Sequence, residues 1–223
     1  MIPTPDLSHL TAKDYDTVYE PAEDTFLLLD ALEADEQQLK SLHPTISLEI
    51  GSGSGCVTSF IGKILGPSVL YLCTDINPHA CRCTLSTGAQ NDVALDAING
   101  SFANPLSARL KHAVDIVLFN PPYVPTVPYE ASAAQGARGI EGAWAGGLDG
   151  MSVTDVFLEC VEELISDRGR FYLVAVAENN IPEIRERMRT RHGLQSEIVL
   201  SRRAGRERLS VLKFVRDPSM VRT

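Results

Sequence analysis

The sequence has 223 residues, a formal net charge of −9 and 44% apolar residues. These values fit one globular domain of ordinary size, and they exclude a disordered or fibrous chain. The acidic balance argues against direct binding of DNA, because Lys and Arg that neutralise phosphates supply most of the affinity of such complexes.

Strands and helices alternate along most of the chain. After an irregular start over 1–18, the pattern predicts a helix at Glu23–Leu32, followed by alternating elements. Strands are predicted at 46–50, 69–74, 94–98, 114–119 and 169–176, helices at 56–65, 78–91, 153–165 and 182–191, and two last strands at 195–200 and 208–215. This order predicts an α/β fold, with a mostly parallel sheet covered by helices on both faces and a C-terminal antiparallel hairpin. We expect a single domain over 1–223, with an N-terminal segment and lid helix (1–32) and a core of sheet and helices (45–215).

A glycine-rich turn, Glu49–Gly55, follows the first strand and precedes a helix. Gly51 and Gly53 permit a tight turn and a close approach by a ligand, although simple turn residues would look the same. The carboxylate of Glu49 would repel a pyrophosphate and attract the ammonium group of a methionine moiety. Asp75 ends the second strand, where it can accept hydrogen bonds from ribose hydroxyls or act as the N-cap of the next helix. Together these features favour a nucleoside ligand.

The segment Tyr19–Thr25 comes before the first helix and allows two interpretations. Asp24 or Thr25 can simply cap the helix. Alternatively, the segment is a lid over the ligand, with Thr25 donating to a carboxylate at the helix N-terminus. The sequence leaves both interpretations open.

The motif Asn120–Tyr123 (NPPY) comes directly after the fourth strand. A planar NH2 group has two N–H donors, and the side-chain oxygen of Asn120 and the carbonyl of Pro121 can each accept one. Tyr123 offers a flat face for stacking. The motif therefore predicts methyl transfer to an amide or amino nitrogen by positioning and electrostatics, and it does not separate glutamine from adenine.

The long stretch from Pro125 to Gly150 is rich in Gly, Ala and Pro, which in a compact domain indicates a functional loop. It contains Trp144, the only tryptophan, which either contacts a protein substrate or packs in the core. Five scattered cysteines form neither a disulfide framework nor a zinc pattern. We therefore interpret Cys81 and Cys83 as reduced thiols on a helix, predict no metal site, and expect a protein of the cytoplasm, with the nucleus as an additional compartment.

With these motifs the chain resembles the HemK family of release-factor glutamine methyltransferases, most closely its eukaryotic branch. The similarity runs from Val18 to Phe214. It includes Tyr19–Thr25 (YEPAEDT), Glu49–Gly55 (EIGSGSG), Thr74–Pro78 (TDINP), Asn120–Tyr123 (NPPY), Gly139–Gly150, Glu178–Asn180 and Leu200–Phe214.

The resemblance implies a class I (Rossmann-like) fold and methylation, by S-adenosylmethionine, of the glutamine in the Gly-Gly-Gln loop of the class 1 translation termination factor. It places cofactor contacts at Tyr19, Thr25, Glu49, Gly51, Gly53, Asp75, Ile76, Ser101, Phe102 and Asn120. It places catalysis at Asn120, Pro121, Pro122 and Tyr123, and substrate binding at Asn120, Pro121, Tyr123 and Trp144. Ser101 departs from the family, which commonly has an acidic residue near the adenine amino group.

The resemblance also implies a heterodimer with a small zinc-binding activator protein that pairs with an edge strand, here expected at 93–98; the chain's own loops could instead mask that strand. The basic segment 182–216, with a net charge of +6, is either a solvated face or a docking patch for an acidic partner.

Other functions are weighed against this one. They are a DNA adenine methyltransferase, which would need a base-flipping surface and a target-recognition domain, a protein-lysine (histone) methyltransferase, a non-enzymatic scaffold, and a nicotinamide dehydrogenase, which leaves Asn120–Tyr123 without a role.

Overall fold

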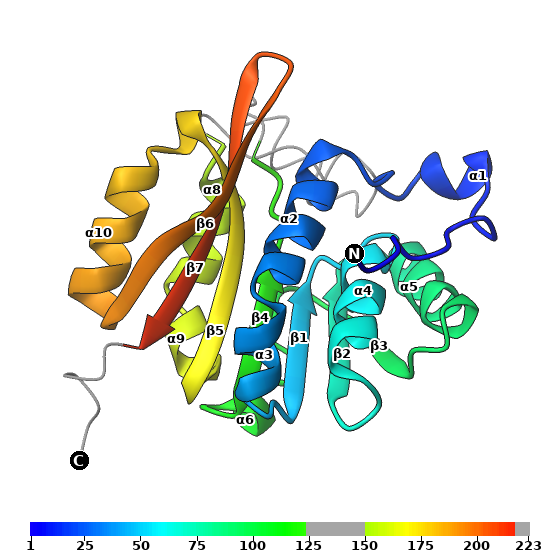
Figure 1. The fold of residues 1–223 in the computed structure, drawn as a ribbon, viewed down its shortest axis with the longest axis horizontal. Coiled ribbons are helices and arrows are strands. Elements are labelled where there is room, and N and C mark those ends of the chain that lie inside the picture. Colours follow the sequence, from blue (N-terminus) through cyan, green and yellow to red (C-terminus); the bar gives the residue numbers. More distant parts are fainter. Residues whose placement is uncertain (124–149, 217–223) are drawn as a thin grey trace.

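The computed structural model describes residues 1–123 and 150–216 (Figure 1). Within these residues, one sheet has the strand order β3-β2-β1-β4-β5-β7-β6. Its strands are β1 (Ile46–Ile50), β2 (Leu70–Asp75), β3 (Leu95–Asn99), β4 (Val114–Phe119), β5 (Ile165–Val176), β6 (Leu194–Ala204) and β7 (Glu207–Arg216). Strands β1 to β5 pair in parallel, and β7 pairs antiparallel with both β5 and β6. The predicted mostly parallel seven-stranded sheet with a C-terminal antiparallel hairpin is confirmed.

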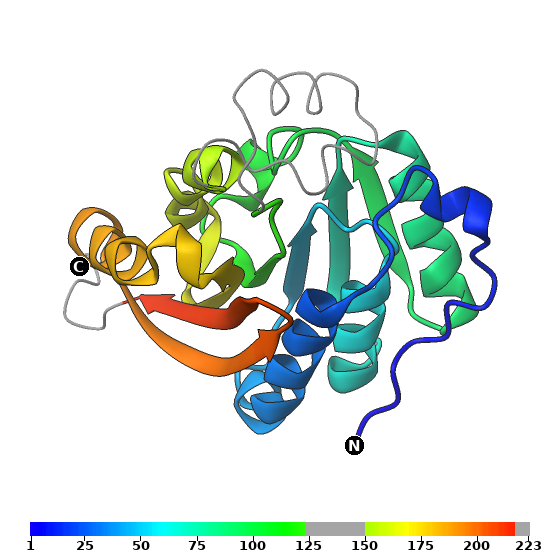
Figure 2. The same ribbon diagram turned by 90° about the horizontal axis from the view of Figure 1, so that it is seen from above.

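Helices cover both faces of this sheet (Figure 2). The described helices are α1 (Ala12–Tyr15), α2 (Glu23–Ala34), α3 (Glu36–Ser41), α4 (Cys56–Leu65), α5 (Pro78–Gln90), α6 (Ser107–Leu110), α8 (Ser152–Leu158), α9 (Val161–Leu164) and α10 (Ile181–His192). One apolar core joins the sheet to α8, α9 and α10, and the other joins it to α2, α3 and α4. None of the helices in the described ranges is long and apolar enough to span a bilayer.

The strand order reverses between β1 and β4. The chain leaves β1 toward β2 and β3 on one side, and β4 continues to β5 on the other. In open α/β sheets such a switch point leaves a crevice beyond the carboxyl ends of the strands, where ligands bind. The fold therefore brings the loops after β1, β2 and β4 to one place, and each of these loops carries a predicted motif.

The prediction of one helix over 153–165 is wrong. Helix α8 ends at Leu158, the short helix α9 follows, and β5 begins at Ile165 rather than at 169. The early start of β5 is held by a side-chain contact, because Ser166 Oγ donates to Asp115 Oδ1 on β4 at 2.7 Å. The register between β4 and β5 shifts between Val114 and Ile116. A contact between residues so far apart in the sequence leaves no local periodic signal.

A buried charge network joins α2 and α3 to the sheet. Lys213 on β7 is 3% exposed, and its Nζ lies 2.7 Å from Asp35 Oδ2, where the two helices meet. Tyr172 on β5 donates to the same oxygen at 2.8 Å, and Glu197 on β6 lies 2.7 Å from the Lys213 ammonium group. A buried charge is tolerated only when it is paired, so these groups depend on one another.

We expect Lys213→Met to lower the free energy of unfolding by about 3 kcal/mol, because it leaves the Asp35 carboxylate buried without its cation. Urea unfolding of the two proteins measures this difference. Lys40→Met is the matched control: Lys40 pairs with Glu36 on the exposed face of α3, and such a pair contributes less than about 1 kcal/mol. Equal effects of the two substitutions would contradict the role assigned to Lys213.

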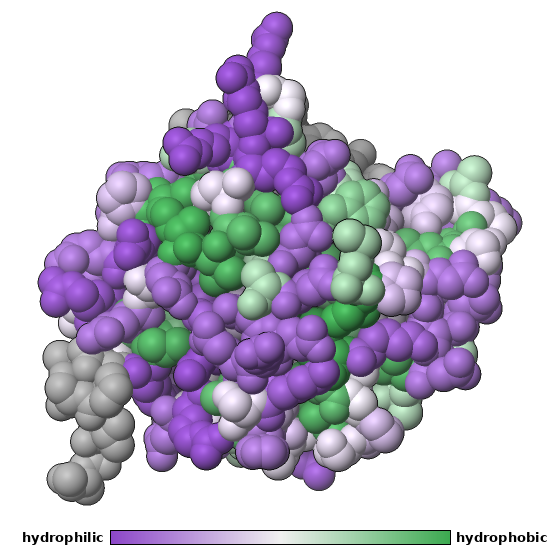
Figure 3. Space-filling model, viewed as in Figure 1, coloured by the Kyte–Doolittle hydropathy of each residue, from purple (hydrophilic) through white to green (hydrophobic). Residues whose placement is uncertain are grey.

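The two edges of the sheet differ. Strand β3 lies at one edge, as predicted for 93–98, and its Leu95, Ala97 and Ile98 are half-buried. Strand β6 forms the other edge and carries an irregularity between Ile198 and Leu200. In Figure 3 apolar surface gathers over β6, beneath the hydrophilic tip of the β6–β7 hairpin.

Candidate active site

A cleft of about 1060 Å³, including its open mouth, lies at the carboxyl ends of β1, β2 and β4. Three sequence-distant motifs line it: the glycine-rich turn, the end of β2 and the start of the NPPY motif. The structure brings together in its walls these residues selected from the sequence: Tyr19, Thr25, Glu49, Gly51, Gly53, Asp75, Ile76, Ser101, Phe102, Asn120, Pro121 and Pro122. A cleft into which polar groups from several motifs converge is the expected form of a ligand site.

The glycine turn leaves backbone space open to the cleft. Gly51 and Gly53 adopt φ of +68° and +53°, a region that residues with a Cβ rarely occupy. No atom outside the neighbouring residues lies within 4 Å of a Cβ built on either glycine. The amide of Gly51 donates to the carbonyl of Thr74 at 2.7 Å, which ties the turn to the end of β2.

Glu49 is a buried carboxylic acid beside this turn. It is 5% exposed, and the backbone amide and hydroxyl of Thr58 both donate to its Oε2, the amide at 2.9 Å. Burial raises the pKa of Glu49 to about 8, although the two bonds from Thr58 oppose that shift. The free protein therefore holds Glu49 protonated at neutral pH, ready to ionise when a cation enters.

We expect the dissociation constant of S-adenosylmethionine to fall by about tenfold per pH unit from pH 6 to about 7.5, where Glu49 of the free protein is neutral and the ammonium group of the ligand keeps its proton. Above about pH 8 the free ligand loses that proton, so the affinity should fall again. Below pH 8 Glu49 is neutral in the free protein, and a cationic ligand favours its ionised form, so binding releases a proton. Calorimetry from pH 6 to 9 in buffers of different ionisation enthalpy measures both quantities. Glu49→Gln should bind weakly with no such slope, and a persisting slope in this variant would contradict the assignment to Glu49.

Asp75 stands at the end of β2 and holds two loops. Its Oδ2 accepts from the amide of Gly53 at 3.0 Å, and its Oδ1 accepts from the amide of Asn77 at 2.8 Å. The alternative that Asp75 caps α5 is wrong, because the N-cap is Asn77, whose Oδ1 accepts from His79 N at 2.8 Å. Burial raises the pKa of Asp75, and the two amide bonds oppose that shift.

The wall after β3 is partly apolar. Phe102 adopts φ of +48° and stacks on Phe157 of α8 with 5.6 Å between ring centroids. Ser101 beside it is exposed and offers a hydroxyl to the cleft. The cleft thus presents buried and half-buried carboxyl groups, an open glycine backbone and an aromatic wall. This set fits a ligand with a cationic head, a ribose and a flat base.

The NPPY motif meets the first turn of α2. Asn120 Nδ2 donates to Asp24 Oδ2 at 3.1 Å, and the hydroxyl of Tyr123 donates to the same oxygen at 3.0 Å. Tyr19 Oη lies 3.2 Å from both carboxylate oxygens. Burial, with the Asp24 carboxylate beside them, raises the pKa of both tyrosines, so both hydroxyls keep their protons. Asn120 Oδ1 is buried and has no hydrogen-bond partner among the described residues.

The interpretation of Tyr19–Thr25 as a helix cap is not what the structure shows. The N-cap of α2 is Ala22, and no side chain caps it. The segment instead lines the cleft through Tyr19, Asp24 and Thr25. No local pattern in the sequence indicates the hydrogen bonds of Asp24 with Asn120 and Tyr123, which lie 96 and 99 residues away.

Comparison with known proteins agrees with this geometry. Methyltransferase HEMK2 of Mus musculus is 51% identical over 213 residues, which cover 96% of each chain. The eRF1 methyltransferase catalytic subunit mtq2 of Schizosaccharomyces pombe is 41% identical over 230 residues, covering 97% of this chain and 96% of that one. The chain belongs to the HEMK2/Mtq2 methyltransferase family.

The family has a solved member with the same fold. The Mtq2 chain of the E. cuniculi Mtq2–Trm112 complex matches this HEMK2/Mtq2-family chain with a TM-score of 0.67 and 26% identity, over 90% of this chain and 99% of that one. No protein-family model matches the sequence. The protein is therefore a methyltransferase of class I fold, as expected.

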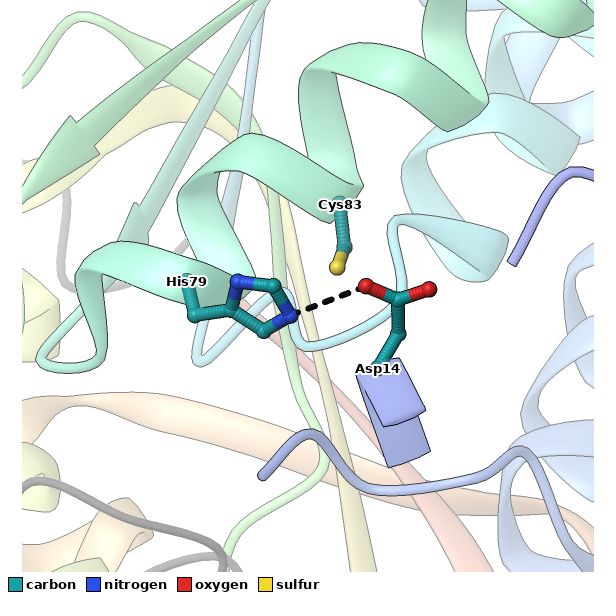
Figure 4. Close-up of side chains that lie close together, drawn as sticks. All are labelled: Asp14, His79 and Cys83. Carbon is teal, nitrogen blue, oxygen red and sulfur yellow. Dashed lines mark hydrogen bonds and ion pairs between the residues drawn. The ribbon is translucent and has the colours of Figure 1, made fainter. Parts of the chain in front are cut away.

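A polar cluster fastens the N-terminal segment of this HEMK2/Mtq2 member beside the cleft (Figure 4). His79 Nε2 on α5 lies 3.0 Å from Asp14 Oδ1 of α1, and the Cys83 thiol lies next to them. The ligand atoms of these three residues lie within 4.8 Å of one another. However, the Arg82 guanidinium is 3.1 Å from His79 Nδ1, and Thr11 donates twice to Asp14. Because the ring nitrogens and the carboxylate already have hydrogen-bond partners and a guanidinium lies beside them, we interpret the cluster as a hydrogen-bonded contact that joins α1 to α5.

Two further predictions concern Trp144 and the basic segment 182–216. Trp144, expected to contact substrate, lies outside the described residues, as does most of the loop around it. The basic segment 182–216 is divided among α10, β6 and β7. Several of its cations pair within the molecule, including Arg187 with Asp155, Arg202 with Asp30 and Arg216 with Glu162.

Proposed function

We propose that this HEMK2/Mtq2-family member transfers a methyl group from S-adenosylmethionine to the side-chain amide nitrogen of the glutamine in the Gly-Gly-Gln loop of the class 1 translation termination factor. The S. pombe relative is named an eRF1 methyltransferase, and the E. cuniculi complex is described as responsible for methylation of eRF1. The observation that carries the proposal is the buried, unpartnered Oδ1 of Asn120 in the wall of the cleft, among the residues that the structure describes.

An orphaned buried acceptor favours a donor as its ligand, because an unpaired buried polar atom costs about 1–3 kcal/mol. The NH2 group of glutamine supplies two such donors. Asn120 Oδ1 would accept one, and the carbonyl of Pro121 in the same wall would accept the other. A lysine ammonium group, the alternative acceptor, is not planar and is not oriented by two acceptors in this way.

The remaining roles follow from the chemistry of each group. Asp75 would accept from ribose hydroxyls, Glu49 would face the cationic head of the cofactor, and Phe102 would pack against the base. Thr25 stands in the first turn of α2, where a carboxylate is favoured. Pro121 and Pro122 are buried and hold the acceptor carbonyl in place. When bound, S-adenosylmethionine supplies a methyl group on a sulfonium, so transfer breaks the carbon–sulfur bond, forms a nitrogen–carbon bond, leaves S-adenosylhomocysteine and releases one nitrogen proton to solvent.

The active form is proposed to be a heterodimer with a small zinc-binding activator protein. The solved relative is in a complex with Trm112. In this chain β3 provides an open sheet edge with half-buried apolar side chains, the kind of edge to which another chain adds a strand.

One assay tests the proposal. This protein is incubated with labelled S-adenosylmethionine and the termination factor, with and without the activator. We expect the label on the nitrogen of the Gly-Gly-Gln glutamine, with more product when the activator is present. A termination factor in which glutamate replaces that glutamine is the matched control, since it keeps a carbonyl oxygen and loses the NH2 group. Label on carbon, on oxygen or on lysine would refute the proposal.

A further inference from the structure

Asp24 is a carboxylate buried among donors. It is 3% exposed, at the second residue of α2. It accepts from the amide of Thr25 at 2.7 Å, from the hydroxyls of Tyr19 and Tyr123, and from Asn120 Nδ2. Buried carboxylates persist where such bonds offset their desolvation, so this one depends on all four neighbours.

The polarity of these bonds fixes the orientation of Asn120. An amide side chain can be turned by 180° with almost no change of shape, which exchanges an acceptor for two donors. A carboxylate only accepts hydrogen bonds, so the NH2 group of Asn120 faces Asp24 and its Oδ1 faces away. Among the described residues that line the cleft, that oxygen is one of two buried side-chain atoms without a partner, the other being Thr74 Oγ1. The opposite orientation would point N–H groups at the NH2 group of the substrate.

We propose that Asp24 is the positioning residue of the reaction. It sets the amide of Asn120, and the hydroxyl of Tyr123 beside it, so that an acceptor oxygen and not an NH2 group faces the nitrogen to be methylated. This inference rests on the proposed function for the identity of that nitrogen. It assigns the polarity of the site to one carboxylate that acts through Asn120.

Asp24→Asn tests the inference with little change in volume. In an asparagine at 24, the backbone amide of Thr25 keeps the oxygen on its own side, so the NH2 group faces Asn120. That NH2 group can donate only to Asn120 Oδ1, so the amide of Asn120 turns over. We expect kcat to fall by about a hundredfold, comparable to the loss of one oriented polar group in other active sites. The dissociation constant of S-adenosylmethionine should change by less than about threefold, because the ribose and ammonium contacts remain. Asp30→Asn is the matched control on the same helix, since Asp30 pairs with Arg202 outside the cleft.

The double variant Asp24→Asn/Asn120→Asp separates polarity from packing. It exchanges the amide and the carboxylate between the two positions. The amide at position 24 can then donate to the carboxylate at position 120, whose second oxygen faces the cleft and restores the acceptor. We expect kcat to recover at least about tenfold over Asp24→Asn alone. Unchanged turnover in Asp24→Asn, or no recovery in the double variant, would overturn the inference.

A measurement on the unsubstituted protein keeps the test independent of folding and of substrate. In ¹⁵N-labelled protein the side-chain NH2 signal of Asn120, identified by its loss in Asn120→Ala, should show one proton shifted downfield and protected from exchange. A solvent-like signal would overturn the role of Asp24. Failure to methylate the termination factor would refute only the proposed function, because this signal needs no substrate.

Discussion

Asn120→Ala is expected to lower kcat for methyl transfer by about a thousandfold. Asn120 supplies the buried oxygen that has no partner in the described structure, and alanine removes both that acceptor and the orientation it imposes. Single oriented hydrogen-bonding groups in active sites contribute about 10²–10³ in rate. Single-turnover transfer to the termination factor, with product mapped by mass spectrometry, measures the loss.

The fold of this variant should stay intact. Asn120 makes one side-chain bond within the described ranges, to Asp24, which keeps its bonds from Tyr19, Tyr123 and Thr25. We therefore expect the midpoint of thermal unfolding to change by only a few degrees. Asn104→Ala, at an exposed position after β3, is the matched control and should keep full activity. Activity of Asn120→Ala near that of the control would remove Asn120 from the reaction.

Asp75→Ala is expected to weaken the binding of S-adenosylmethionine by about a hundredfold. Hydrogen bonds to a charged group contribute about 1.5–3 kcal/mol each, and a ribose offers two hydroxyls. The substitution also frees the amides of Gly53 and Asn77, which loosens the glycine turn that approaches the ligand. Calorimetry with the purified protein measures the dissociation constant.

Asp167→Ala is the matched control for this change. Asp167 is exposed and lies near the start of β5, at the end of the parallel sheet opposite the cleft. Its removal should leave the dissociation constant unchanged. If Asp75→Ala also bound S-adenosylmethionine with unchanged affinity, the carboxylate would serve only to join two loops.

The elements near the cleft were predictable because their signals are local. The strands at 46–50 and 114–119 and the helix at 56–65 have the predicted bounds. Each is a mostly apolar stretch with a glycine or proline within two residues of at least one end, so neighbouring residues define it. The short polar helices α1, α3 and α6 have no such run.

Asp24 shows why part of the site was missed, and which signal was present. Along α2, the buried positions Asp24, Leu27, Leu28, Ala31, Leu32 and Asp35 recur at helical spacing on one stripe. Two acids therefore interrupt an apolar stripe, one at each end, and a buried acid requires a partner. The pattern indicates that partners exist. It does not name Asn120 or Lys213, because those lie about 100 or more residues away and meet α2 only in the folded chain.

The contrast between the two sheet edges bears on how a newly made chain aggregates. Strand β6 has a bulge and carries charges at Glu197, Arg202 and Arg203, devices that discourage another strand from adding to an edge. Strand β3 is regular and has only Asp96 as a charge. A newly made chain therefore has one sheet edge that can pair with another strand, at β3, and one protected edge, at β6. At high expression, we expect misassembly to give dimers in which the β3 strands of two copies pair edge to edge. Such dimers cannot grow into fibres, because the β6 edge of each copy does not accept another strand.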